Sequence, residues 1–295
     1  VLNNRPRFDS EVLWLIDGIL SPTPPAKHAR SLPARLEPTG DPIDLGEISA
    51  TRGGEPRKWW QFRAHGQPAF AAGPIHLTVR PGGAVWLRGD NGAGKTTLLR
   101  AMSGLLPVNA GQVRFGGHDM TNATPRDAAR AGLVHVIEGH RVFTQISVAD
   151  NLLLAGYDLP RAERVVRVEE ALSFFPEIAE KRHERGGALS GGQQQMLTVA
   201  QGLVRRPRLL MLDEPSAGLS PVLVDRVLNV IGRLRAQGTS VLLVEQLLEK
   251  ALACADRVYA LVQGAIALEA PTSESDLAHR LERAYFGHAS HALGG

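Results

Sequence analysis

Residues Val85–Met102 read VWLRGDNGAGKTTLLRAM, and this stretch decides how the rest of the chain is interpreted. An apolar run, Val85–Leu87, leads into a loop that fits the pattern G-x-x-x-x-G-K-S/T from Gly89 to Thr96. Apolar residues at helical spacing follow at once. The order predicts a buried strand, a glycine-rich loop and a helix whose N-terminus faces an anion together with the loop N–H groups. The alternative is a glycine-rich turn that merely matches the pattern.

The residue types in this loop suit a nucleoside triphosphate. Glycines have no Cβ, so the backbone can curl closely around phosphate oxygens. Lys95 would neutralise the β- and γ-phosphates, and the Thr96 hydroxyl would bind Mg²⁺. The sequence thus predicts that this loop binds a nucleoside triphosphate together with Mg²⁺. The residues predicted to bind the nucleotide are Gly89, Asn91, Gly92, Ala93, Gly94, Lys95, Thr96 and Thr97.

Composition narrows the class of protein. The 295 residues are 43% hydrophobic, enough to bury a core, and no apolar run approaches the roughly 18 residues that span a bilayer. We therefore expect a soluble or peripheral protein. The single cysteine, Cys254, rules out an intrachain disulfide framework and suits the reducing cytosol. The net charge of +3 comes without a basic stripe, so no nucleic-acid partner is expected.

Three later strand-like runs deliver polar residues into loops. Arg208–Glu214 (RLLMLDE) ends in two adjacent acids, whose like charges need a cation to offset them. Asp213 is predicted to hold Mg²⁺, and Glu214 to polarise the attacking water. Ser240–Val244 leads into Glu245-Gln246, and Leu133–Ile137 leads into the loop Glu138–Phe143. The carboxyl ends of parallel strands are where α/β proteins place their chemistry.

Leu189–Gln195 reads LSGGQQQ and predicts the start of a helix that runs to about Val204. Ser190 is a natural N-cap, and Gly191 and Gly192 leave the helix N-terminus bare. The simple interpretation is a capped helix. The functional interpretation is that this terminus receives a γ-phosphate presented by another molecule.

The chain is predicted to have several parts. Glu11–Leu20 could form a short amphipathic helix, and prolines make Ser21–Asp44 a linker. Ile48–Val79 predicts a small antiparallel sheet, in which Trp60, Phe62 or His65 either stacks on adenine or belongs to the core. The expected divisions are an extension or linker at 1–47, an ATPase domain at 48–287 with a helical subdomain at about 145–188, and a tail at 288–295.

LRGDNGAGKTT, LSGGQQQ and LLMLDEP, in this order, resemble the nucleotide-binding subunit of ABC transporters over roughly Ile75 to Gly287. IEGHRVF, LLVEQ, EPSAGLSP and AYFG look most like one of the two ATPases of branched-chain amino acid importers. The resemblance implies an α/β P-loop NTPase fold. Its core sheet would be mainly parallel, with a small antiparallel β subdomain and an inserted helical subdomain.

The resemblance also implies partners. Ser190, Gly191, Gly192 and Gln193 would bind the γ-phosphate of ATP held by a second cassette, so that two ATP molecules lie in a dimer. The helical subdomain and the loop Glu138–Phe143 would contact transmembrane permease subunits, and a solute-binding protein would act indirectly. The protein would lie peripherally on the cytoplasmic face of the cell membrane. ATP hydrolysis there would power transport.

Two positions depart from the general cassette pattern. Glu138 stands where a glutamine is usual, and Gln246 where a switch histidine is usual. Glu138 could reach Mg²⁺ directly or through water, whereas Gln246 could donate to the γ-phosphate without a positive charge. We expect slower hydrolysis, catalysed by Glu214, Gln246 and Lys95, and a heterodimer with a more orthodox cassette. The alternatives are a urea or amide importer, a cassette fused to an exporter, and a soluble non-transport cassette.

Overall fold

The computed structural model describes residues 14–16, 19–21, 43–52, 70–139 and 141–289. The chain separates into two compact units, Val1–Pro33 and Ala34–Gly295. In the first unit, β1 (Trp14–Ile16) pairs with β2 (Ile19–Ser21) in an antiparallel hairpin. The helix expected over Glu11–Leu20 is therefore wrong at these positions. Its apolar residues have high strand propensity, and the sequence between the two strands is Asp-Gly, a favoured hairpin dipeptide.

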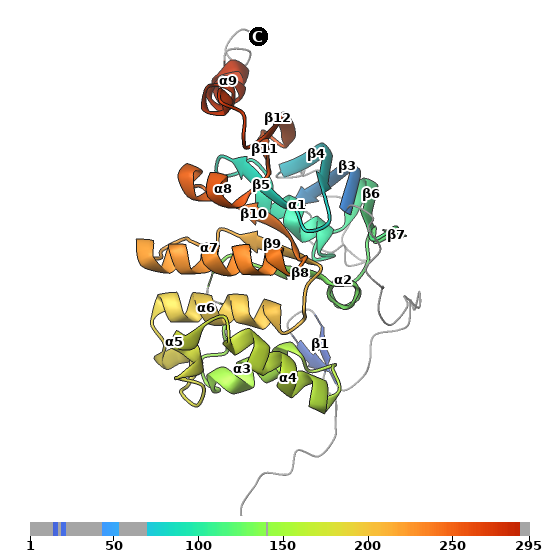
Figure 1. The fold of residues 1–295 in the computed structure, drawn as a ribbon. Coiled ribbons are helices and arrows are strands. Elements are labelled where there is room, and N and C mark those ends of the chain that lie inside the picture. The colour runs from blue at the N-terminus through green and yellow to red at the C-terminus, as the bar shows by residue number, and fades with distance from the viewer. Residues whose placement is uncertain (1–13, 17–18, 22–42, 53–69, 140, 290–295) are drawn as a thin grey trace, which may run out of the picture. The chain divides into compact units, whose positions relative to one another are not determined.

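The core of the second unit is a six-stranded sheet in the order β12-β11-β5-β10-β9-β8 (Figure 1). All neighbours pair in parallel except β12, which is an antiparallel edge strand. Every residue of β9 and β10 is buried, as expected for apolar strands covered on both faces. The strands are β5 (Ala84–Gly89), β8 (Leu133–Val136), β9 (Leu209–Asp213), β10 (Ser240–Val244), β11 (Arg257–Val262) and β12 (Ala265–Pro271).

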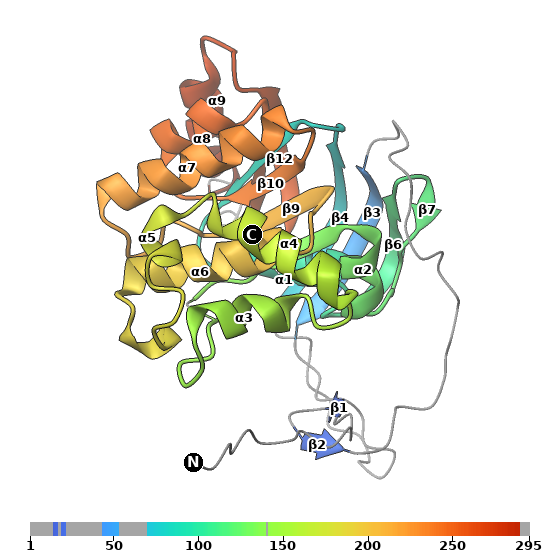
Figure 2. The same ribbon diagram turned by 60° about the horizontal axis from the view of Figure 1, so that its bottom comes forward.

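A second, antiparallel sheet has the order β4-β3-β6-β7 and lies together on one side of the molecule in Figure 2. Its strands are β3 (Ile43–Arg52), β4 (Phe70–Val79), β6 (Val108–Phe115) and β7 (His118–Asp119). The small antiparallel sheet is thus confirmed, but β3 begins directly after Pro42, earlier than the expected start at Ile48. The expected boundary at 47/48 falls inside this strand. Trp60, Phe62 and His65 lie outside the described residues.

Helices flank the parallel sheet. They include α1 (Lys95–Met102), α2 (Pro125–Ala131), α6 (Gly191–Leu203), α7 (Pro221–Ala236), α8 (Leu248–Cys254) and α9 (Leu277–Ala289). The helix α9 extends into the tail expected at 288–295. Among the described residues, none of the helices combines the length and apolar character needed to cross a membrane.

The chain between β8 and α6 supplies a group of helices, α3 (Val148–Ala155), α4 (Arg161–Leu172) and α5 (Pro176–Ala179). Figure 1 shows α6 between the parallel sheet and these helices. Within the range 145–188, where a helical subdomain is expected, these helices end at Ala179, and turns and a short 3-10 helix (Gly186–Ala188) follow. The glycines at 186 and 187 disfavour an α-helix in this segment, because glycine has a low helix propensity.

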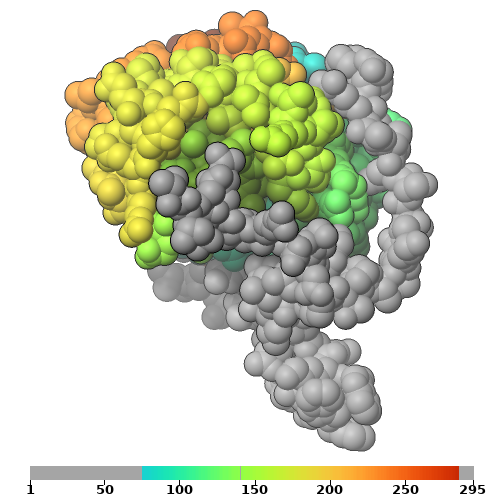
Figure 3. Space-filling view, turned by 90° about the horizontal axis from the view of Figure 1, so that it is seen from below, coloured from blue at the N-terminus to red at the C-terminus, as the bar shows by residue number. Residues whose placement is uncertain are grey.

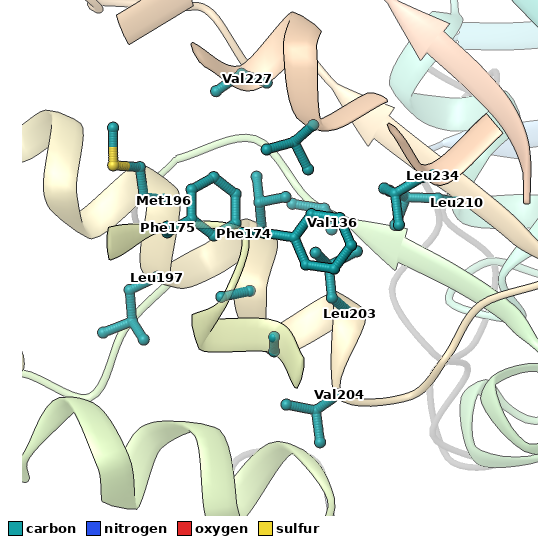
Figure 4. Close-up of a cluster of buried hydrophobic side chains, with 14 of the residues drawn as sticks. Val136, Phe174, Phe175, Met196, Leu197, Leu203, Val204, Leu210, Val227 and Leu234 are labelled. Carbon is teal, nitrogen blue, oxygen red and sulfur yellow. The ribbon is translucent and has the colours of Figure 1, made fainter. Parts of the chain in front are cut away.

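One hydrophobic core joins these helices to the sheet (Figure 4). Phe174 and Phe175 follow α4 and enter a cluster with residues of α6, α7 and the strands β8 and β9. Phe175 is fully buried. The labelled members are Val136, Phe174, Phe175, Met196, Leu197, Leu203, Val204, Leu210, Val227 and Leu234. This core is therefore continuous between the helices and the sheet that carries the polar loops.

Candidate functional site

The loops that follow β5, β10, β9 and β8 meet at one edge of the sheet. These four strands are adjacent and parallel, so their carboxyl ends lie on the same side. The loops begin at Asp90 after β5, Glu245 after β10, Glu214 after β9 and Ile137 after β8. The fold thereby gathers the glycine-rich loop, the two acids after β9 and the glutamine after β10.

Close approach and unusual backbone angles explain the glycines of the loop after β5. A Cβ on Gly89 would lie 2.6 Å from the carbonyl oxygen of Leu261 on β11. Gly94, with φ 107° and ψ 5°, is the N-cap of α1, and no side chain caps this helix. The Ala93 carbonyl accepts a hydrogen bond of 3.1 Å from the N–H of Gly264 in the β11–β12 turn. The neighbouring hairpin therefore fixes a loop that leaves a helix N-terminus uncapped for an anion.

Lys95, the first residue of α1, folds back onto this loop. Its ammonium group donates to the carbonyl oxygens of Gly89 at 2.7 Å and Asp90 at 3.1 Å. It also lies 3.9 Å from Glu214 Oε1, and the side chain is only 6% exposed. The Lys95 ammonium is thus held at the glycine-rich loop by neutral carbonyl acceptors. It can exchange them for an anionic ligand, because hydrogen bonds between two charged groups are stronger.

Asp213 ends β9 as a buried carboxylate, 2% exposed. Within the described residues, neither of its oxygens has a hydrogen-bond partner that satisfies the usual geometry. Burial raises the pKa of Asp213, and the charges of Glu138 and Glu214 act in the same direction. The nearby Thr96 hydroxyl and Lys95 ammonium lower this pKa. A buried, unsatisfied carboxylate beside a hydroxyl and two further acids fits the oxygen-rich donor set of a hard divalent cation.

The raised pKa of Asp213 gives a prediction for stability. The folded state holds this proton to higher pH than the unfolded chain does, because the pKa of Asp213 is higher in the folded state. The free energy of unfolding therefore falls as pH rises from the pKa of the unfolded chain to that of the folded state. At pH 7 the ionised carboxyl therefore destabilises the nucleotide-free protein. Asp213→Asn removes the charge and keeps the shape, so we expect Tm to rise by about 2–4 °C, the effect of roughly 1 kcal/mol at this size.

Thermal unfolding at pH 7, with and without Mg²⁺ and ATP, measures this effect. The variant should gain stability without nucleotide and lose most of the extra stability that Mg²⁺ gives the wild type in the presence of ATP. An unchanged or lower Tm for the nucleotide-free variant would show that the Asp213 carboxylate is not a destabilising charge.

Glu214 and Gln246 are in direct contact. Gln246 Nε2 donates to Glu214 Oε1 at 2.9 Å and lies 3.4 Å from Asn91 Oδ1 in the glycine-rich loop. Glu214 has φ 48°, a left-handed conformation that is uncommon for residues other than glycine, and its N–H donates to the carbonyl oxygen of Val244. Three predicted residues from three loops thus meet, and the backbone of β10 holds Glu214 in a strained conformation.

The loop that contains Glu138 is anchored by a residue that the sequence did not reveal. Asn151, fully buried on α3, accepts a hydrogen bond from the N–H of Phe143 at 2.8 Å and donates to its carbonyl oxygen at 3.0 Å. Gln201 of α6 donates to the same Asn151 oxygen at 3.4 Å. In the sequence, the only sign of this role is that Asn151 is a polar residue beside the apolar run Leu152–Leu154. Asn151 therefore connects this loop to both α3 and α6.

Ser190 forms the N-cap of α6, as predicted from the sequence. Its hydroxyl accepts from the N–H of Gln193 at 3.3 Å, and Gln193 Oε1 accepts from the N–H of Ser190 at 3.1 Å, which completes a capping box. A Cβ on Gly192 would lie 2.1 Å from Leu223 Cδ1 on α7. In the described part of the chain, no hydrogen bond or ion pair joins Ser190–Gln193 to Gly89–Thr96.

Two residues at the sheet edge were given no role by the sequence, Ser216 and Glu245. Both side chains are buried, and the Ser216 hydroxyl donates to a Glu245 carboxylate oxygen. A signal was available for Glu245, because it directly follows a buried strand just as Glu214 does.

Comparison with known proteins agrees with this arrangement. The family model described as "ABC transporter" matches residues 72–217. The branched-chain amino acid transport ATP-binding protein BraG of Pseudomonas aeruginosa is 37% identical over 194 residues, 66% of this chain and 83% of BraG. The lipopolysaccharide export ATP-binding protein LptB of Escherichia coli K12 is 32% identical over 216 residues, 72% of this chain and 89% of LptB.

A solved structure is similar in fold. A dimeric ATP-binding cassette in a post-hydrolysis state with ADP and phosphate superposes with a TM-score of 0.65 at 19% identity, over 79% of this chain and 99% of that one. At that identity the likeness concerns the fold alone. The similarity to BraG and LptB extends over 83% and 89% of their respective lengths. The chain therefore belongs to the ABC transporter ATP-binding family, as an ATPase subunit with a P-loop NTPase fold.

Proposed function

We propose that this ATPase subunit powers an importer of branched-chain amino acids. The observation that supports catalysis best is the meeting of Lys95, Glu214 and Gln246 beside the unsatisfied carboxylate of Asp213. The importer assignment rests on the similarity to BraG.

Phosphate binding begins with Lys95. Its ammonium would leave the carbonyl oxygens of Gly89 and Asp90 for the β- and γ-phosphate oxygens, and the loop N–H groups would donate to the same phosphates. Thr96 and Asp213 would hold Mg²⁺, with Glu138 nearby. Bound there, Mg²⁺ would offset the charge of the phosphates and of the buried Asp213.

Hydrolysis would use Glu214 as the group that accepts a proton from water while the water oxygen attacks the γ-phosphorus and ADP departs. Gln246, already bonded to Glu214, would donate to a γ-phosphate oxygen. A neutral amide stabilises developing negative charge less than a protonated histidine does, and Glu138 adds a negative charge at the site. Slow hydrolysis is the expected consequence.

A second cassette completes the site in this proposal. Among the described residues, no hydrogen bond or ion pair joins Ser190–Gln193 to the subunit's own phosphate loop, and Ser190 and Gly191 are exposed. They would bind the γ-phosphate of ATP held by the facing subunit. The dimeric cassette of similar fold supports this arrangement, and a heterodimer with a cassette that has the usual glutamine and histidine would provide a faster second site.

The helices α3 and α4, in the yellow-green surface of Figure 3, would contact the permease at the cytoplasmic face of the membrane. Large apolar side chains are exposed there, as expected of a surface covered in a complex. They are Phe143, Leu154, Tyr157, Val165 and Val166, with exposures of 43–56%. A solute-binding protein would act through the permease. The similarity to LptB supports a second candidate, a cassette that powers export.

The test is ATP hydrolysis with Mg²⁺ by the purified protein, alone and together with the cassette and permease subunits encoded beside it. We expect activity chiefly in the assembled complex reconstituted in vesicles, with ATP-dependent uptake of leucine, isoleucine or valine. Activity that ignores these partners would contradict a transport role. Coupled activity without uptake of these amino acids would favour the export or amide alternatives.

A further inference from the structure

Glu245 is a buried acid that joins two catalytic loops. It follows β10 and is only 4% exposed. Among the described residues, no lysine or arginine forms an ion pair with it. Its oxygens instead receive three hydrogen bonds, from the N–H groups of Gln246 at 2.7 Å and Leu247 at 3.1 Å and from the Ser216 hydroxyl. Burying a carboxylate without a counter-ion costs folding free energy. A glutamate at this position therefore calls for a functional explanation.

The two carboxylate oxygens of Glu245 serve different loops. Oε1 accepts both backbone N–H groups of the loop after β10, which carries Gln246. Oε2 accepts from Ser216, two residues beyond Glu214 in the loop after β9. A serine or asparagine could satisfy the two backbone N–H groups alone, as such residues do in ordinary caps. The longer, two-pronged carboxylate is needed only to reach the second loop as well.

The backbone of Glu245 is fixed independently. Its carbonyl oxygen accepts from the indole N–H of Trp86 at 2.8 Å, and Trp86 is fully buried on β5. The strand β5 ends at the phosphate loop, which precedes Lys95. Glu245 therefore contacts β5 as well as the loops that carry Glu214 and Gln246. A rigidly held carboxylate of this kind can set the distance between side chains that it does not itself touch.

We propose that Glu245 is a positioning residue for hydrolysis. It holds the loops after β9 and β10 together, so that Gln246 Nε2 and Glu214 Oε1 stay within hydrogen-bonding distance. The proposal rests on the hydrolytic roles proposed for Glu214 and Gln246. It assigns Glu245 no contact with ATP, so nucleotide binding should not depend on it.

The experiment compares kcat and KM for ATP in the assembled complex for Glu245→Ala, Glu245→Gln and Ser216→Ala. Glu249→Gln is the matched control, because Glu249 is an exposed acid four residues further on. Glu245→Ala should lower kcat by about 10–100-fold with KM within about twofold, the size expected for misplaced catalytic groups. Glu245→Gln keeps an acceptor for the N–H groups and a donor toward Ser216, so it should retain most of kcat.

A double variant separates positioning from a general structural effect. In the Glu214→Gln background, Glu245→Ala should change the residual kcat by less than about twofold, because residues that act as one unit are not additive. Equal losses in both backgrounds, or a raised KM with unchanged kcat, would overturn the proposal. Ser216→Ala, which cuts only the link to the loop after β9, is the second variant if Glu245→Ala does not fold, and an unchanged kcat for it would also overturn the proposal.

The same assay separates failure of the catalytic roles of Glu214 and Gln246 from failure of the positioning role of Glu245. If Glu214→Gln hydrolyses ATP as fast as the wild type, the proposed catalytic roles fail, whatever Glu245 does. If Glu214→Gln is inactive and Glu245→Ala is as active as Glu249→Gln, the roles stand and the positioning inference fails.

Discussion

Glu214→Gln is expected to lower kcat for ATP hydrolysis by about 10²–10⁴-fold, the usual contribution of a positioned general base. The amide has the same shape, and its oxygen can still accept the 2.9 Å hydrogen bond from Gln246. What disappears is the group that takes the proton from water. ATP affinity should change little, because the phosphate loop and Lys95 remain in place.

The measurement is steady-state hydrolysis by the assembled complex, with ATP binding measured separately by calorimetry. The variant should also retain ATP, so that dimers of cassettes accumulate in its presence. Glu249→Gln controls for the loss of one negative charge. A kcat within threefold of the wild type would show that another group activates the water.

Lys95→Met is expected to weaken ATP binding by about ten- to a hundred-fold. Hydrogen bonds to charged groups contribute about 1.5–3 kcal/mol each, and about 1.4 kcal/mol corresponds to a factor of ten. Methionine keeps the length of the stem, which is almost entirely buried. The carbonyl oxygens of Gly89 and Asp90 lose a donor, but they lie in a loop whose backbone is also held by Gly264. The fold should survive.

Calorimetric titration with ATP and with AMP tests this prediction. The loss should be large for ATP and absent for AMP, which has no β- or γ-phosphate for Lys95 to contact. Lys250→Met is the control, since Lys250 pairs with Asp225 on the surface. Equal weakening for ATP and AMP would mean that the variant has distorted the loop rather than removed a phosphate contact.

Local sequence was sufficient for the phosphate loop, the buried strands and the N-cap of α6. Each depends on neighbours within a few residues, such as glycines with positive φ or a serine three residues before Gln193. The carboxyl-edge location of Asp213, Glu214 and Gln246 was also predictable, because parallel strands align their ends. The family resemblance added the fold class, which the sheet order confirms.

Local pattern misled where two structures were compatible with the same residues. The apolar residues of Glu11–Leu20 are compatible with one face of an amphipathic helix, yet residues 14–16 and 19–21 pair as a hairpin. The start of β3 at Ile43 was likewise missed, since the prolines before it suggested a longer linker. In both cases the competing strand signal comes from cross-strand pairing, which a single segment does not display.

The chemistry of individual site residues depended on contacts between distant segments. Glu245 and Ser216 are 29 residues apart, and Asn151 and Gln201 are 50 apart. Residue types and order told us which loops carry phosphate-binding and acidic groups, because those preferences are local. Burial, the missing partners of Asp213 and the contact between Glu214 and Gln246 arise only when the sheet brings loops together, because the dielectric and the partner of a side chain are set by segments far away in the chain.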